Sequence, residues 1–388
     1  MLNKLNNDNI VILLLSSIIF NYFLLFSSSL ILLVKLNLLL FFFLNFIFFY
    51  KLNKNIFLLL IIITLLIICL GSLTNQWDAR SLWLFKAKRI YLDLSVISIK
   101  DNYAIFSHPD YPNIGPAFIA GFSKCFGFWN EIYPKVALTL MFIPALILLN
   151  KYFFNNNFLL VMFLILFTIG KFLVNGEMDG LVSIYFTVSF LVIYNLSLKD
   201  SSKKNDFILA ILLIIILSML KIEGFILSLI IIFTVTTFMI VKKKINYQII
   251  FCLSLAIMPA IIWQIFTTTV NINNASSPYN YNLEDFSLRF LQVENYFLIS
   301  KYMILNDKFF FSIIFFIITY LYSKNKNILK YVVSLIFIYM AILYIVYLST
   351  PLDLEWHLNS SATRVVKPMA LFLFILGVYN INYKNKIY

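Results

Sequence analysis

Long apolar segments alternate with short polar ones along almost the whole chain. A helix that crosses a bilayer needs about 20 apolar residues, and shorter segments can cross where the bilayer thins. On this basis the pattern predicts about twelve membrane spans in an all-α polytopic protein. They run approximately over Ile10–Val34, Leu36–Tyr50, Ile56–Leu73, Tyr133–Leu149, Phe158–Val174, Leu181–Leu198, Phe207–Leu220, Phe225–Val241, Ile249–Thr267, Phe309–Tyr322, Tyr331–Leu348 and Val365–Tyr379.

The composition agrees with a membrane protein. Of the 388 residues, 62% are hydrophobic and 12% are charged, so folding in water would leave large apolar surfaces exposed. No soluble segment, internal repeat or low-complexity linker interrupts the pattern, which predicts a single membrane domain over residues 1–388. The first apolar segment has no small-residue cleavage site and is too long for a signal-peptide core, so we expect it to remain as a span.

The distribution of charge predicts the orientation. Most lysines fall in alternate connections, accompanied only by Asp8, Asp200 and Asp206 among the carboxylates. These lysines are Lys4, Lys51, Lys54, Lys151, Lys199, Lys203, Lys204, Lys242, Lys243, Lys244, Lys324, Lys326, Lys330, Lys384 and Lys386. By the positive-inside rule that side is cytoplasmic, and the net charge of +13 reflects topology anchors, with no nucleic-acid partner expected. The other side receives two long loops, at about 74–132 and about 270–308, with the short turns that carry most of the candidate chemistry.

The first outer loop is predicted to contain two interfacial helices. In Ala79–Leu92 the apolar Trp83, Ala87, Ile90 and Tyr91 share one helical face, and the basic residues of the segment cover much of the rest. These basic residues are Arg80, Lys86, Lys88 and Arg89. Ala117–Phe128 is predicted to be the second helix, with Trp129 at the level of the lipid head groups. The loop is therefore expected to form a lid.

Asp78 is the first candidate for a catalytic base, because it follows the third span directly and can project toward a lipid head group. Transfer of a glycosyl group from an anionic lipid carrier needs a carboxylate to accept the proton and cations to stabilise the departing phosphate. Arg80, Lys86 and Lys88 are the candidate cations. In the alternative interpretation, Asp78 only pairs with Arg80 or caps the interfacial helix.

Glu177 and Asp179 lie at the outer mouth between two predicted spans, flanked by Gly176 and Gly180. Carboxylates at this depth are costly unless they are paired, hydrated or bound to metal, which makes them functional candidates. Three roles are open: binding a divalent cation together with Asp78, accepting hydrogen bonds from sugar hydroxyls, or capping the following helix. The metal requirement stays undecided.

Further polar groups on the same side are candidates for substrate binding. Lys221 and Glu223 interrupt an apolar stretch, where they either face a substrate or pair with each other. Arg364 precedes the last predicted span and is well placed to meet a phosphate. The remaining candidates are His108, Asp110, Tyr111 and His357, although a lone histidine is more often structural than catalytic.

Together these motifs resemble the bacterial GT-C glycosyltransferases, most closely the membrane proteins related to protein mannosyltransferases and to lipid A aminoarabinose and galacturonosyl transferases. The resemblance runs from about Ile56 to Arg364. It is carried by the aspartate after an early span, by the turns His108-Pro109-Asp110-Tyr111-Pro112-Asn113-Ile114-Gly115-Pro116 and Gly176-Glu177-Met178-Asp179-Gly180, and by Lys221-Ile222-Glu223-Gly224. It implies a polyprenyl-phosphate sugar donor and an essential acidic residue in the first outer loop, here Asp78. The chain departs from the family in lacking a paired acidic residue beside Asp78 and in carrying two extra early spans.

These observations predict a glycosyltransferase that moves a sugar from a polyprenyl-phosphate donor to a lipid or cell-surface glycan acceptor. The expected location is the outer face of a bacterial cytoplasmic membrane, among membrane lipids, and the one possible cofactor is a divalent cation. A polysaccharide polymerase or ligase is the alternative enzyme, but the second long loop contains only Arg289 and no histidine. A lipid or sugar transporter is the alternative outside enzymes, and it would need charged or broken-helix sites near the middle of the bilayer.

Overall fold

The computed structural model describes residues 6–51, 56–97, 108–153, 156–198, 204–243, 246–269, 283–323 and 328–385. Parts of both predicted outer loops, residues 98–107 and 270–282, lie outside these ranges, as do several orienting lysines: Lys4, Lys54, Lys199, Lys203, Lys244, Lys324, Lys326 and Lys386. Within the described ranges every regular element is a helix, which confirms the predicted all-α class.

Nineteen α-helices are assigned within the described residues. Their bounds are α1 (Asn7–Leu24), α2 (Ile31–Lys51), α3 (Ile56–Gly71), α4 (Leu84–Asp93), α5 (Ile114–Phe126), α6 (Val136–Met141), α7 (Ile143–Tyr152), α8 (Asn156–Ile169), α9 (Asp179–Leu198), α10 (Lys204–Leu220), α11 (Ile222–Val241), α12 (Tyr247–Ala256), α13 (Met258–Thr269), α14 (Leu283–Phe290), α15 (Val293–Ile304), α16 (Asp307–Leu321), α17 (Ile328–Leu348), α18 (Leu354–Val365) and α19 (Lys367–Asn385). Short helical turns also occur at η2 (Ser28–Leu30), η3 (Ala79–Trp83), η5 (Tyr133–Lys135) and η6 (Gly170–Leu173), of which η3 is π-helical.

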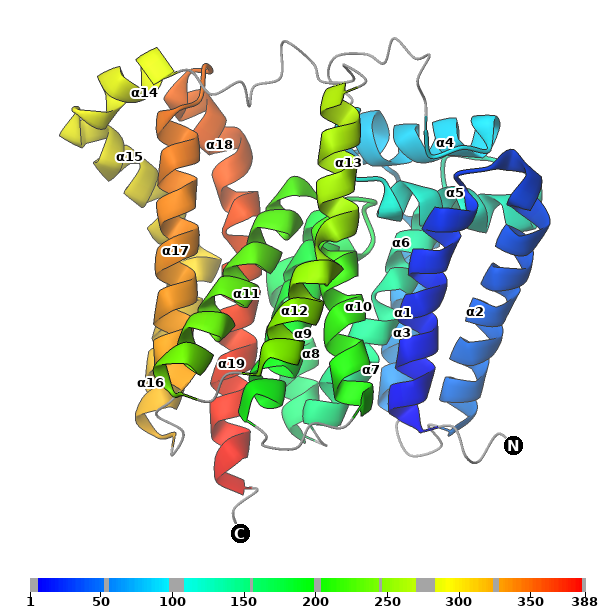
Figure 1. The fold of residues 1–388 in the computed structure, drawn as a ribbon, viewed down its shortest axis with the longest axis horizontal. Coiled ribbons are helices and arrows are strands. Elements are labelled where there is room, and N and C mark those ends of the chain that lie inside the picture. The colour runs from blue at the N-terminus through cyan, green and yellow to red at the C-terminus, as the bar shows by residue number, and fades with distance from the viewer. Residues whose placement is uncertain are drawn as a thin grey trace.

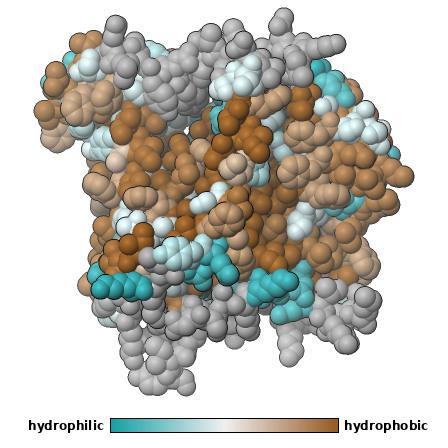
Figure 2. Space-filling model, in the orientation of Figure 1, coloured by the Kyte–Doolittle hydropathy of each residue, from teal (hydrophilic) through white to brown (hydrophobic). Residues whose placement is uncertain are grey.

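Most helices stand side by side in one bundle, and α4 lies across them at one end (Figure 1). The start of α1 and the end of α19 lie at the opposite end of the bundle. Figure 2 shows a broad apolar band around the middle of the visible face, as expected of a protein surrounded by lipid. The buried core is continuous between the upright helices, with α9 and α19 buried along most of their length.

In the part of the chain that the structure describes, eight helical segments are long and apolar enough to cross a membrane, and a ninth is obtained if the bent pair α15–α16 counts as one. The predicted segments Ile56–Leu73 and Phe158–Val174 form only shorter apolar helices. The structure therefore supports a polytopic membrane protein without confirming the full set of twelve spans.

Two span boundaries differ from the prediction. The expected first span, Ile10–Val34, is broken because α1 ends at Leu24 and α2 begins at Ile31. A run of three serines lies at this turn, where the Ser27 and Ser29 hydroxyls lie 2.8 Å apart in a hydrogen bond. Serine hydroxyls compete with helical backbone hydrogen bonds, so this run ends the helix although apolar residues surround it.

The second difference is at the C-terminal end. The last span was predicted to start at Val365, but α18 and α19 together form one apolar segment, Leu354–Ile381. Pro368 explains the short break between the two helices, because proline cannot donate a hydrogen bond to the carbonyl four residues earlier. His357 and Arg364 consequently lie within a candidate span and not in a loop before it.

The two segments predicted to be interfacial helices are helical, and they are more buried than helices on a membrane surface would be. The apolar face of α4 packs against α5, with Ala87 and Ile90 almost inaccessible. The periodicity predicts that Lys86 lies on the polar face of this helix. That prediction is wrong, because Lys86 is only 2% exposed. The second helix, α5, is buried from Ile114 to Ser123, where it packs against α1, α2, α4 and α6. It is therefore a core element covered by α4, and not a surface helix.

Candidate functional site

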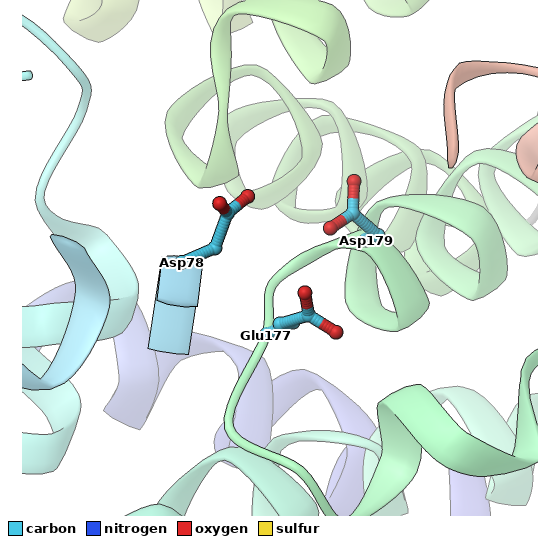
Figure 3. Close-up of side chains that lie close together, drawn as sticks. All are labelled: Asp78, Glu177 and Asp179. Carbon is cyan, nitrogen blue, oxygen red and sulfur yellow. The ribbon is translucent and has the colours of Figure 1, made fainter. Parts of the chain in front are cut away.

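Three carboxylates from two distant segments meet in one place. One oxygen from each of Asp78, Glu177 and Asp179 lies within 4.8 Å of the others. Figure 3 shows the Asp78 side chain facing Glu177 and Asp179 across a shared space. Asp78 immediately precedes η3, Glu177 lies in the turn before α9, and Asp179 is the first residue of α9.

The turn before α9 is built to place Glu177 against the Asp78 segment. Gly176 has φ of 90°, a conformation that side chains with a Cβ rarely adopt. A Cβ at Gly176 would also come within 3.3 Å of the Ala79 Cβ, which shows how closely the two segments approach. The Asn175 side chain then holds the next residue, accepting from the Glu177 backbone N–H at 3.0 Å and donating to its carboxylate.

Two cations from other helices compensate the acidic group. The Arg364 guanidinium of α18 donates to the Asp78 carboxylate. The Lys221 ammonium, between α10 and α11, lies 3.0 Å from an Asp179 oxygen and 3.0 Å from a Glu223 oxygen. Of the two roles open for Lys221 and Glu223, the pairing is present, with Asp179 as a further partner of the lysine.

The group as a whole remains acidic. Among the described residues, two cations pair directly with the four carboxylates of Asp78, Glu177, Asp179 and Glu223. Two charged carboxylates within 4.8 Å of each other repel by at least about 3 kcal/mol at an effective dielectric constant near 20. Burial and the neighbouring Asp179 carboxylate accordingly raise the pKa of Glu177 above its ordinary value. Glu177 therefore holds a proton more readily than an ordinary glutamate does.

The basic residues after Asp78 do not form the predicted phosphate-binding face. Arg80 is exposed, and Asp78 pairs with Arg364 instead of with this neighbour. Lys88 is half exposed and lies 2.9 Å from Glu131. Lys86 points inward, where its ammonium donates to the Tyr111 carbonyl at 3.1 Å. The structure thus separates three residues that the sequence placed together.

The His108–Tyr111 turn forms a second polar group beside the carboxylates. The His108 ring stacks on the Tyr111 ring with centroids 4.7 Å apart, and the Lys86 ammonium lies 5.6 Å from the centre of that tyrosine ring. Asp110 is held through its carbonyl, which accepts from the Trp263 indole of α13 at 2.8 Å. Burial lowers the pKa of His108, and the nearby Asp110 carboxylate opposes that effect.

His108 of this turn also lies near enough to Asp78 and Lys221 for their charges to act on it.

His357 has a different environment. Its Nδ1 lies 3.0 Å from the Thr350 hydroxyl, and its ring makes an edge contact with Tyr347. We therefore assign His357 to the packing of α17 against α18.

The three carboxylates have the chemistry to hold a divalent cation, since oxygen ligands are what Mg²⁺ and Ca²⁺ prefer. Asp179 is 6% exposed, and its Oδ2 atom is buried without a hydrogen-bond partner, which leaves a ligand atom free. A cation there would compete with Arg364 for Asp78. The residues fit a metal ion, while the arginine already supplies part of the charge that such an ion would bring.

Several residues of the site were not predicted from the sequence. Asn175 and Gly176 shape the turn, Trp263 holds the Asp110 backbone, and Lys367 lies near enough to Asp179 and Glu177 to interact with their charges. The glycine before an acidic pair was the one readable signal, because glycine favours turns with positive φ. No family model, curated protein or solved structure matches the chain, so its geometry is what bears on function.

Proposed function

We propose that this protein is a membrane-embedded glycosyltransferase that takes a sugar from a polyprenyl-phosphate carrier and passes it to a hydroxyl of a lipid or glycan. The observation that carries the proposal is the meeting of Asp78, Glu177 and Asp179 with Arg364 and Lys221 at interruptions of apolar helices. Ionisable groups placed there are costly in a membrane protein and are retained for function. The proposal includes a GT-C-like bundle of about twelve spans whose site opens to the extracytoplasmic face.

The proposed reaction assigns one role to each kind of group. The acceptor oxygen attacks the anomeric carbon, and its proton passes to the Asp78 carboxylate. The bond between the anomeric carbon and the phosphate oxygen breaks, and the negative charge that develops on the phosphate is stabilised by cations, with Arg364 nearest to the base. Glu177 and Asp179 hold sugar hydroxyls, and the His108–Tyr111 turn forms the wall of the acceptor site.

The test begins with identification of the donor and proceeds to the base. Native mass spectrometry of the protein purified in mild detergent is expected to retain a polyprenyl phosphate or its glycosylated form. With that donor, Asp78→Asn should lose at least 99% of transfer, since general-base catalysis contributes about 10²–10⁴-fold. Asp93→Asn is the matched control, because Asp93 pairs with Arg89 at the far end of α4. Full transfer by Asp78→Asn would refute the assignment of the base.

A transporter of lipids or sugars is the second candidate, favoured by one observation. Arg364 and Lys367 lie at the break between α18 and α19, inside the candidate span Leu354–Ile381. Charged groups at broken helices occur in transporters. Cysteines at positions 78, 177 and 357 distinguish the two functions: labelling from both faces in different states supports transport, and labelling from one face supports transfer.

A polymerase or ligase is less well supported, because its expected loop arginine has a structural role here. Arg289 donates to the backbone carbonyls of Thr350 and Leu352 and so fixes α14 against the turn before α18.

A further inference from the structure

Three helix interruptions meet beside the carboxylate site. The end of α8 passes into η6, the pair α15–α16 bends by 74°, and α18 gives way to α19. The Lys308 ammonium, at the start of α16, donates to the carbonyls of Phe167 and Thr168 at 2.7 and 3.2 Å. Helix α19 packs against both α8 and α16. The three breaks therefore lie side by side.

Each interruption carries a lysine, and we call these three residues, Lys171, Lys308 and Lys367, the lysine port. Lys367 lies close enough to both other lysines for their charges to act on it. Its ammonium also rests 3.7 Å from the centre of the Phe172 ring. Like charges gathered beside an apolar surface are costly unless an anion joins them.

One member of the lysine port, Lys367, lies near the candidate site. The charges of Asp179 and Glu177 act on the Lys367 ammonium. Lys367 lies three residues after Arg364, so about one helical turn separates the port from the cation that binds Asp78. A head group bound at the port would thus have its next atoms beside the carboxylates.

The helices that carry the port present large apolar side chains outward. On α8, Phe163 and Phe167 are 63% and 43% exposed, and on α16, Phe310 and Phe311 are 43% and 55% exposed. Leu305, in the bend between α15 and α16, is 62% exposed. Such a surface suits hydrocarbon chains, whereas the lysines suit an anion. A molecule with both properties is an anionic lipid.

We propose that the lysine port is a lateral binding site for the phosphate-bearing head group of a lipid substrate, which enters from the bilayer between α8 and the α15–α16 bend. This proposal rests on the proposed function, because it names the entry of the lipid-linked substrate into the same site. The lipid chain lies on the exposed aromatic residues of α8 and α16. The phosphate contacts Lys171 and Lys367, while Lys308, with two N–H groups given to α8 carbonyls, has one left for the phosphate.

The experiment measures lipid binding to the full-length protein in nanodiscs, with undecaprenyl phosphate and phosphatidylglycerol as probes. The variants are Lys171→Gln, Lys367→Gln and the double variant, and Lys308 is kept because its bonds cap α8. Lys301→Gln is the matched control, since Lys301 is an exposed lysine in the last turn of α15, about one turn before the bend. We expect the double variant to bind undecaprenyl phosphate about 10- to 30-fold more weakly, and the control to bind as the parent does.

Unchanged binding by the double variant would overturn the port, as would an equal loss in the Lys301→Gln control. If the double variant loses affinity for phosphatidylglycerol by the same factor as for undecaprenyl phosphate, the lysines make only ordinary contacts with lipid head groups. That result also overturns the port. If the double variant does not purify, Lys171→Gln decides alone, because its side chain is exposed and an about fivefold loss is expected. Binding and transfer are scored separately: a port that binds undecaprenyl phosphate while the parent protein transfers no sugar leaves the port standing and refutes the transferase.

Discussion

The ion pair between Asp78 and Arg364 joins residues 286 positions apart, and its removal should affect stability asymmetrically. Arg364 also feels the charges of Glu177 and Asp179, so it compensates three carboxylates at once. Arg364→Gln removes this positive charge from the surroundings of all three carboxylates. Asp78→Asn, in contrast, removes one negative charge from a group that has too many. We therefore expect the arginine substitution to be the more destabilising of the two.

The size of the effect follows from the partial burial of the pair. Breaking a fully buried ion pair costs about 3–5 kcal/mol, and an exposed pair contributes about 0–1 kcal/mol. The Arg364 and Asp78 side chains are 26% and 18% exposed, which places their coupling at about 2–3 kcal/mol. Arg364→Gln should cost about 3 kcal/mol, and Asp78→Asn about 1 kcal/mol or less. The double variant should be more stable than Arg364→Gln alone.

The assay is thermal unfolding of the four proteins in one detergent, with equal amounts of added lipid. A loss of about 3 kcal/mol should lower the Tm by several degrees, whereas Asp78→Asn should stay within about two degrees of the parent. Arg80→Gln is the control, because Arg80 is an exposed neighbour of Asp78 and should change stability by less than about 0.5 kcal/mol. Equal and additive effects of the two single substitutions would refute the reasoning.

Two further substitutions test the turn and the buried lysine. Gly176→Ala places a Cβ at a φ of 90° and 3.3 Å from the Ala79 Cβ, so it should lower the free energy of unfolding by about 1–3 kcal/mol and reduce sugar transfer. Stability is measured as Tm, and transfer is measured at saturating donor. A variant with unchanged Tm and transfer would contradict the assigned packing. Burial lowers the pKa of Lys86 to about 7 from its ordinary 10.5, so the unfolded chain binds more protons between these values and stability rises with pH across that window. Lys86→Met should therefore be more stable than the parent at pH 7 and lose about 3–4 kcal/mol of that advantage by pH 10. The lost bond to Tyr111 reduces the stability of the variant by about 1 kcal/mol at every pH. A difference in Tm that stays constant with pH would argue against the pKa shift.

Much of the fold could be predicted from hydropathy, because each predicted apolar segment contains a helix. The errors lie where a short polar signal competes with a long apolar one. The serines near Ser27 end α1 within an apolar run, and Pro368 only interrupts a segment that continues to Ile381. Hydropathy averages over many residues and therefore misses both effects. Helical periodicity likewise identified one face of α4, but it could not say that α5 covers that face or that Lys86 points inward.

The candidate site was predictable in its acidic members and not in its cations. Asp78, Glu177 and Asp179 each stand at a polar interruption of apolar sequence, and that is a local signal. The partner of Asp78 depends on how α18 packs, so the nearest basic residue in the sequence, Arg80, is not the one that binds it. Trp263 presents the same problem, because an indole in an apolar helix gives no sign that it holds a distant backbone carbonyl.

The charge balance of the site relates the proposed base to the lysine port. Glu177 has a raised pKa because of its burial and the charge of Asp179, and Arg364 is among the groups that oppose this rise. An anionic head group bound at Lys171 and Lys367 would add negative charge nearby and favour the protonated form of Glu177 still further. A protonated carboxyl donates a hydrogen bond to a sugar oxygen but cannot accept the proton of the acceptor hydroxyl. The proton of the acceptor hydroxyl is therefore assigned to Asp78, the carboxylate that pairs with Arg364, and not to Glu177.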